Sequence, residues 1–328
     1  MARRSAIGAV VLALVIACTA CTGSSAGSPG SAGGSPPGPA PPGPASAGGA
    51  GPGVITVGSF DFPESVLLAY LYAGALSARG YPVRVLPDLG SRELVEPALM
   101  TGLVQLVPEY TGSALGFVSL GRAHATADVT ATAAALANAM AARGIVTARS
   151  AEAQDANAIV VTGPTAARYR LRTISDLTRA ARELVFGGPP ECPERPDCLP
   201  GLRRTYGLRF RAFAALDAGG PLTRQALEAG DIGAALLFTT DPAIRAGHLV
   251  ELTDNRDLQP AENVIPVLRR ATADRYGPGL LAALDAVSAR LSTAALTALN
   301  AQVQMNGRDP HAVAGSWLRD QGLGRGTS

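Results

Sequence analysis

The chain contains no lysine, so all 28 of its lysine-or-arginine positions are arginine. A ligand that binds a lysine or arginine side chain in other proteins can therefore bind only arginine here. The planar guanidinium of arginine binds carboxylates through two hydrogen bonds. The formal net charge is only +2 and no basic tract is present, which argues against a nucleic-acid partner.

Sequence signatures of enzymes are also missing. From residue 54 onward there is no G-x-S-x-G motif, and no H-E-x-x-H motif occurs in the chain. The three histidines lie in unrelated contexts, so a Ser–His–Asp set is not expected. Glu64 and Glu109 could form a carboxylate pair, but helix capping and loop anchoring explain them better. We therefore predict no enzyme activity, no cofactor and no metal site.

The N-terminus has the features of an export signal. A basic start precedes an apolar run from Ile7 to Ala17, which has the length of a signal-peptide core and is too short to span a bilayer. The run ends before Cys18 in a pattern similar to a bacterial lipobox, whose cysteine is lipidated, and Cys21 is the alternative. An ordinary cleaved signal peptide is the competing interpretation. We predict a lipoprotein signal in residues 1–21 and a lipid anchor on the outer face of the cytoplasmic membrane.

Residues 22–53 consist almost entirely of Gly, Pro, Ser and Ala, with no charged residue. This composition cannot bury a core and predicts a disordered tether. No later apolar run reaches membrane-spanning length, so we expect no membrane-spanning segment in the rest of the chain.

After the tether, strand-like apolar runs alternate with helix-like segments. The predicted strands are 54–58, 83–86, 103–107, 158–161, 184–186, 211–216, 233–238, 249–252 and 264–268. The predicted helices are 62–79, 91–102, 127–143, 221–229, 276–290, 293–300 and 310–321, with two more beginning at 111 and 173. This alternation predicts an α/β fold with mostly parallel sheets and helices on both faces.

Three strand-to-helix turns carry short polar motifs. They are Gly58-Ser-Phe-Asp-Phe-Pro-Glu-Ser65, Leu89-Gly-Ser-Arg-Glu93 and Pro108-Glu-Tyr-Thr-Gly112. Ligands of open α/β sheets bind at the carboxyl ends of strands, so the turns predict a small-molecule site. In order and spacing the motifs resemble the substrate-binding proteins of osmoprotectant ABC importers, the glycine betaine/choline/carnitine class. The resemblance covers nearly all of 54–328, and its details are similar to an actinobacterial subgroup.

The resemblance implies a two-lobed type II periplasmic-binding-protein fold with a two-strand hinge. Lobe one would comprise 54–156 and 252–328, and lobe two 157–251. A small compatible solute would bind between the lobes and be delivered to an ABC permease and its ATPase by a monomeric extracytoplasmic protein. A surface protein with no transport role is a less favoured alternative.

The candidate ligand-binding residues follow from the strand ends and from the resemblance. They are Ser59, Asp61, Ser91, Tyr110, Thr111, Ser113, Asp155, Asn157, Glu191, Arg195, Phe238, Thr240, Glu262 and Asn263. The resemblance makes Tyr110 an aromatic wall for a quaternary ammonium and gives Ser113 and Arg195 contacts to a ligand carboxylate. Helix capping explains Asp61, Ser91 and Thr111 equally well, and Tyr110 could instead be a packed wall residue.

Departures from the family pattern weaken the expected aromatic cage. Phe60 stands where the family often has lysine, Glu262 replaces a cage tyrosine, and residues 155–157 include no aromatic residue. Only Tyr110 and Phe238 then remain as walls. The ligand could therefore be a polyol, a phenolic or another polar solute instead of a quaternary ammonium compound.

Cys192 and Cys198 lie six residues apart in a proline-rich loop. In an exported protein this spacing predicts a disulfide that closes a small loop, in preference to two free thiols.

Overall fold

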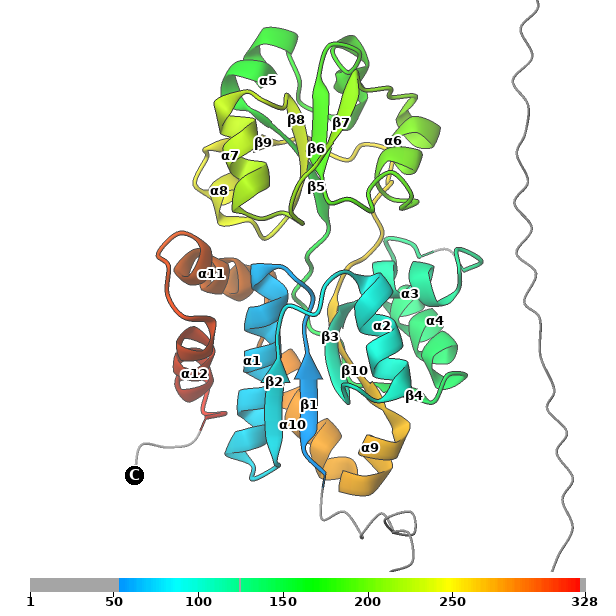
Figure 1. Ribbon diagram of the computed structural model, residues 1–328, viewed down its shortest axis with the longest axis vertical. Helices are drawn as coiled ribbons and strands as arrows, with labels where there is room; N and C mark the ends of the chain where they lie inside the picture. Colours follow the sequence, from blue (N-terminus) through cyan, green and yellow to red (C-terminus); the bar gives the residue numbers. More distant parts are fainter. Residues whose placement is uncertain (1–52, 124, 325–328) are drawn as a thin grey trace, which may run out of the picture. The chain divides into compact units, whose positions relative to one another are not determined.

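The computed structural model describes residues 53–123 and 125–324. The predicted signal peptide, the lipidation at Cys18 or Cys21 and nearly all of the predicted tether lie outside these residues. The described chain forms two five-stranded sheets with flanking helices, both within one compact unit (Figure 1). We call the first sheet with its helices lobe one and the second sheet with its helices lobe two.

The sheet of lobe one has the strand order β2-β1-β3-β10-β4. Its strands are β1 (Ile55–Gly58), β2 (Val83–Leu86), β3 (Leu106–Tyr110), β4 (Ile145–Thr147) and β10 (Val264–Arg269). β1 is parallel to β2 and β3, whereas β10 is antiparallel to both of its neighbours. The carboxyl ends of β1, β2 and β3 therefore lie at the same edge of the sheet.

Eight helices belong to the described part of lobe one. They are α1 (Pro63–Ala78), α2 (Arg92–Thr101), α3 (Thr111–Val118), α4 (Val129–Ala141), α9 (Arg270–Tyr276), α10 (Pro278–Ser288), α11 (Thr293–Gln304) and α12 (Pro310–Asp320). α1 is apolar on most of its surface because it packs against the sheet and against α10, α11 and α12. Trp317 of α12 lies in this core, as its apolar helical pattern predicts.

The sheet of lobe two has the strand order β7-β6-β8-β5-β9. Its strands are β5 (Asn157–Thr162), β6 (Val185–Gly188), β7 (Ala212–Ala215), β8 (Ala234–Phe238) and β9 (Leu249–Glu251). β6 is parallel to β7 and β8, and β5 is antiparallel to β8 and β9. The predicted α/β class is confirmed. Both sheets are mixed, because in each of them one strand runs opposite to the other four and two of the four neighbouring pairs are antiparallel.

Both faces of this second sheet are covered. The helices are α5 (Gly163–Tyr169), the 3-10 helix η1 (Ile174–Arg179), α6 (Leu199–Tyr206), α7 (Pro221–Ala229) and α8 (Pro242–Arg245). Successive strand residues point to opposite faces. Ile159 and Val161 accordingly pack in one core, whereas Ala158 and Val160 pack in the other.

Two segments, 148–156 and 252–263, connect the lobes, and they lie side by side around residues 153–155 and 262–264. The amide of Val264 donates to the carbonyl of Ala153 at 2.9 Å, and the amide of Asp155 donates to the carbonyl of Glu262 at 3.0 Å. This two-stranded connection is positioned to act as a hinge.

The third strand differs from its prediction. β3 covers Leu106–Tyr110, three residues later than the predicted 103–107, because Pro108 was expected to end the strand. Pro108 instead lies opposite Pro266 in the register, a position where the missing N–H of each proline removes no bond between the two strands. Tyr110 is therefore the last residue of a buried strand and not part of a loop.

The other differences are strand β4, which was not predicted, and several short helices. The helix expected from Thr173 is the 3-10 helix η1, and α5, α6, α8 and α9 were not predicted. Among the described helices none is long and apolar enough to cross a membrane alone. Only α10 and α11 taken together, bent by 83°, pass that test of length and composition.

Candidate functional site

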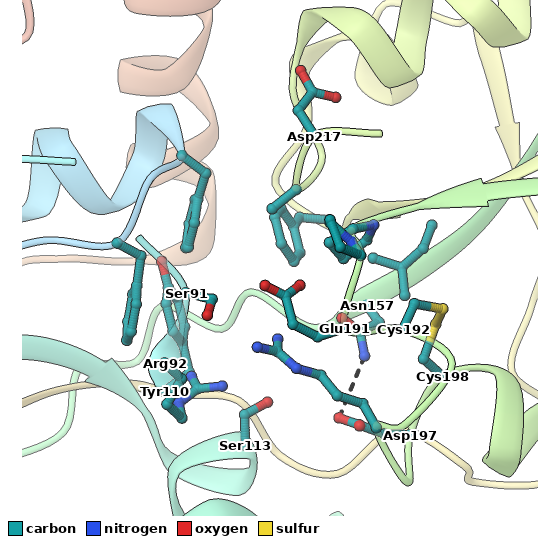
Figure 2. A pocket seen from close by; sticks show the side chains of 18 of the residues that line it. Ser91, Arg92, Tyr110, Ser113, Asn157, Glu191, Cys192, Asp197, Cys198 and Asp217 are labelled. Carbon is teal, nitrogen blue, oxygen red and sulfur yellow. Dashed lines mark hydrogen bonds between the residues drawn. A yellow bond between two sulfur atoms is a disulfide. The ribbon is translucent and has the colours of Figure 1, made fainter. Parts of the chain in front are cut away.

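A cavity of about 240 Å³ lies where the two lobes face each other. Lobe one contributes the segments after β1 and β2 and the end of β3, and lobe two contributes the segments after β6 and β7 and the end of β8. The residues therefore gather at the carboxyl ends of parallel strands, where ligands of open α/β sheets bind. Figure 2 shows Glu191 reaching from lobe two toward Ser91 and Tyr110 of lobe one.

The cavity brings together ten of the candidate residues. They are Asp61, Ser91, Tyr110, Ser113, Asp155, Asn157, Glu191, Arg195, Phe238 and Glu262. The other four, Ser59, Thr111, Thr240 and Asn263, do not line it. The Thr111 hydroxyl donates to the carbonyl of Ala261, and the Asn263 amide donates to the carbonyl of Ala151, both at 2.9 Å. These two side chains tie the crossing segments to lobe one.

The alternative explanation as helix caps is wrong for Asp61 and Thr111, because the residues at the N-cap positions of α1 and α3 are Phe62 and Tyr110. Ser91 does occupy the N-cap position of α2, as predicted, but its side chain makes no capping bond. Asp61 and Ser91 are left on the wall of the cavity.

Four aromatic rings line the cavity, and the ring of Phe62 lies next to each of the other three. The centroid of the Phe62 ring lies 5.8 Å from that of Phe60, 6.0 Å from that of Tyr110 and 5.2 Å from that of Phe238. Phe238 belongs to lobe two and the other three belong to lobe one. Phe60 and Phe62 were not among the candidate residues, although their place directly after the first strand was a signal that could have found them.

Tyr110 is tied to a buried network that joins the lobes. Its hydroxyl donates to Oε1 of Glu64 at 2.8 Å, while Oε2 of Glu64 accepts from Thr240 Oγ1 and Asn300 Nδ2, each at 2.5 Å. Thr240 Oγ1 also lies 2.8 Å from Oδ1 of Asp155. The Thr240 hydroxyl has only one hydrogen, but it lies within hydrogen-bond distance of the carboxyl groups of both Glu64 and Asp155. At least one of these two carboxyl groups is therefore expected to carry a proton.

Burial raises the pKa of both carboxyl groups in this network. For Glu64 the hydrogen bond from Thr240 opposes the effect, and for Asp155 the charge of Glu64 adds to it. Burial and the charge of Glu64 likewise raise the pKa of Tyr110. The Tyr110 hydroxyl is thus a donor within the protein, and the Tyr110 ring is the part that faces the cavity.

Arg92 forms a buried ion pair with a carboxylate of the protein. Its Nε and Nη2 atoms donate to the two carboxylate oxygens of Glu109, each at 2.8 Å, and its guanidinium lies 5.0 Å from the centroid of the Phe60 ring. Glu96 is buried next to this pair, and neither of its oxygens has a donor among the described residues. Burial and the charge of Glu109 raise the pKa of Glu96 to about 9. We therefore expect Glu96 to be protonated at neutral pH.

Glu262 occupies the N-terminus of α3. Its Oε2 atom accepts from the amides of Gly112 and Ser113 at 3.0 and 3.1 Å, and its Oε1 atom lies 2.6 Å from Ser113 Oγ. Burial raises the pKa of Glu262 to about 8, against the hydrogen bonds from Ser113. The side chain of Glu262, which was expected to stand in place of a cage tyrosine, therefore lies against the helix end and bonds to the hydroxyl of Ser113.

The proline-rich loop of lobe two contains the predicted disulfide. Cys192 and Cys198 are bonded, with their Cα atoms 5.3 Å apart. The loop also carries Arg195, whose Nη2 atom pairs with Oε2 of Glu93 of lobe one at 3.1 Å. The guanidinium that was expected to hold a ligand carboxylate is thus paired with a carboxylate of the chain.

Comparison with known proteins decides the family. A family model described as the substrate binding domain of the ABC-type glycine betaine transport system matches residues 53–320. The chain belongs to this family. It is therefore the substrate-binding component of an ABC importer and not an enzyme.

Relatives agree in sequence and in structure. A glycine-betaine-binding protein of Pseudomonas aeruginosa is 30% identical over 280 residues, which cover 82% of this chain and 88% of that protein. The glycine betaine-binding protein YehZ of Escherichia coli is 26% identical over 277 residues, which cover 82% and 90%. A solved glycine betaine/carnitine/choline ABC transporter structure matches with a TM-score of 0.66, 23% identity and coverage of 82% of this chain and 99% of that one. This last similarity shows the fold.

Proposed function

We propose that the chain captures a small quaternary ammonium solute in the cavity between its lobes and delivers it to an ABC permease. The group of four aromatic rings, Phe60, Phe62, Tyr110 and Phe238, is the observation that carries this proposal. Aromatic faces attract quaternary ammonium groups through the ring quadrupole. Phe60 and Phe62 add two aromatic rings to Tyr110 and Phe238, the two walls that were expected from the sequence.

The contacts between the lobes support a clamp mechanism. Phe62 and Phe238 meet across the cavity, and Thr240 of lobe two bonds to Glu64 of lobe one. A ligand between these surfaces contacts both lobes only when the lobes are closed, so it binds the closed conformation more tightly than the open one. Binding therefore increases the fraction of the protein that is closed. A permease can then distinguish the loaded protein from the empty one.

We also propose the cellular setting that the sequence predicts. Residues 1–21 would direct export and lipidation at Cys18 or Cys21, and residues 22–53 would tether a monomeric binding domain to the outer face of the cytoplasmic membrane. Lobe one would comprise 54–156 with 252–328, and lobe two 157–251. The permease and its ATPase would be separate chains, and the protein would be of the actinobacterial type.

Phe62 provides the sharpest test of the aromatic site. The Phe62→Ala protein is expected to bind choline or glycine betaine about 30-fold more weakly than wild type, because a desolvated cation–π contact contributes about 2 kcal/mol. Isothermal titration calorimetry of both proteins measures this difference. The control is Phe117→Ala, which truncates a partly buried ring of α3 that does not line the cavity.

The control protein should keep wild-type affinity. Equal affinities of wild type and Phe62→Ala would contradict the assignment of the aromatic site. No binding of any trimethylammonium compound to the wild-type protein would contradict the proposed ligand class.

A further inference from the structure

Each positive feature that borders the cavity is already occupied by a carboxyl group of the chain. Oxygen Oε2 of Glu262 accepts the amides of Gly112 and Ser113 at the N-terminus of α3, at 3.0 and 3.1 Å. Helix N-termini are the places where backbone donors and the helix dipole favour a ligand carboxylate. Glu262 is only 3% exposed, so it blocks this position.

A carboxylate also lies at the start of α2, the second helix end at the cavity. The side chain of Glu93 pairs there with Nη2 of Arg195 at 3.1 Å. The remaining guanidinium, that of Arg92, is held by both oxygens of Glu109. The guanidinium of Arg92 is therefore not free to bind a ligand carboxylate, and that of Arg195 could bind one only by leaving its exposed pair with Glu93.

The carboxyl groups of the lining outnumber the guanidinium groups. Six side chains carry carboxyl groups, Asp61, Asp155, Glu191, Asp197, Asp217 and Glu262, against Arg92 and Arg195. Burial raises the pKa of Asp61 of lobe one, and repulsion from the charge of Glu191 of lobe two adds to this effect. A cation between them would relieve this repulsion, whereas a ligand carboxylate would add to it.

We propose that the ligand is an organic cation without a carboxylate, and that Glu262 is the residue that excludes zwitterions. This inference rests on the proposed function, since it selects among quaternary ammonium solutes for the same cavity. Glu262 blocks the helix end in either protonation state, because Oε2 accepts both amides whether or not Oε1 carries a proton. The selection therefore depends on the occupied space and donors, not on the charge of Glu262.

Choline and glycine betaine form a matched pair of probes. Both carry a trimethylammonium group, but choline ends in a hydroxyl and glycine betaine in a carboxylate. Calorimetric titration of the wild-type protein is expected to give an affinity for choline about tenfold or more above that for glycine betaine, because the betaine carboxylate would be buried without its charged hydrogen bonds.

Two variants of Glu262 separate blocking from charge. In Glu262→Ala the amides of Gly112 and Ser113 become free, so the affinity for glycine betaine should rise about tenfold relative to that for choline. In Glu262→Gln the side-chain carbonyl can still accept both amides, so the wild-type preference should remain. Thermal melts of both variants verify folding, and the wild-type comparison and Glu262→Gln still test the inference if Glu262→Ala does not fold.

The outcomes distinguish this inference from the proposed function. Wild-type binding of glycine betaine at least as tight as that of choline, or equal ligand preferences in Glu262→Ala and Glu262→Gln, would overturn the inference and leave the proposed function in place. No binding of either compound would overturn the proposed function and the inference with it.

Discussion

Replacing Arg92 by alanine is expected to lower the free energy of unfolding by about 3–5 kcal/mol. The guanidinium of Arg92 neutralises Glu109, which is fully buried at the end of β3, through two hydrogen bonds of 2.8 Å. Its removal leaves a carboxylate without a counter-charge next to the buried Glu96. Denaturation of the purified protein by urea, followed by circular dichroism, measures the change.

Arg195→Ala is the matched control for this prediction. Arg195 also forms one ion pair with a glutamate, but the side chains of Arg195 and Glu93 are 30% and 46% exposed. Solvent-exposed pairs contribute about 0–1 kcal/mol, so this variant should unfold almost like wild type. If Arg92→Ala were no less stable than Arg195→Ala, the Arg92–Glu109 pair would not have the structural role that we assign to it.

The stability of the protein should fall as the pH rises from about 5 to about 8. Burial and the charge of Glu109 raise the pKa of Glu96 to about 9, so Glu96 binds a proton in the folded protein over this range but loses it on unfolding. The folded state therefore binds more protons, and its stability declines by about 1.4 kcal/mol per pH unit for this one group. Glu262, whose pKa burial raises to about 8, acts in the same direction.

Glu96→Gln isolates this contribution. The amide has the shape of the protonated carboxyl group and can donate to Glu109 but cannot ionise. Unfolding measured at several pH values should show a slope that is shallower than that of wild type by up to about 1.4 kcal/mol per pH unit. Glu228→Gln, at an exposed position of α7, should leave the slope unchanged. An unchanged slope in Glu96→Gln would mean that Glu96 is ionised in the folded protein.

Much of the fold could be predicted because its signals are local. Helix α7 begins at Pro221 and ends before Gly230, as proline and glycine placement predicts. The buried strands β8 and β10 were visible as short apolar runs bounded by polar residues. The short helices α5, α6, α8 and α9 were missed because each is one or two turns long and has too few residues for an apolar period to show.

The site was harder to predict because its charges depend on contacts between distant residues. The sequence placed Glu262 near the ligand, but its contact with Ser113 joins residues 149 positions apart. The pairing of Arg195 with Glu93 likewise depends on how the two lobes meet. Phe60 was considered only as a lost lysine, and its role as an aromatic wall emerged from its stacking on Phe62.

A crystal structure of the protein with bound choline tests the central claim most directly. We predict that the trimethylammonium nitrogen lies in the cavity, within about 6 Å of the ring centroids of Phe62 and Phe238. Glu262 should keep its hydrogen bonds to the amides of Gly112 and Ser113. A ligand bound outside the cavity, or a ligand in the cavity that contacts none of the four aromatic rings, would contradict the account.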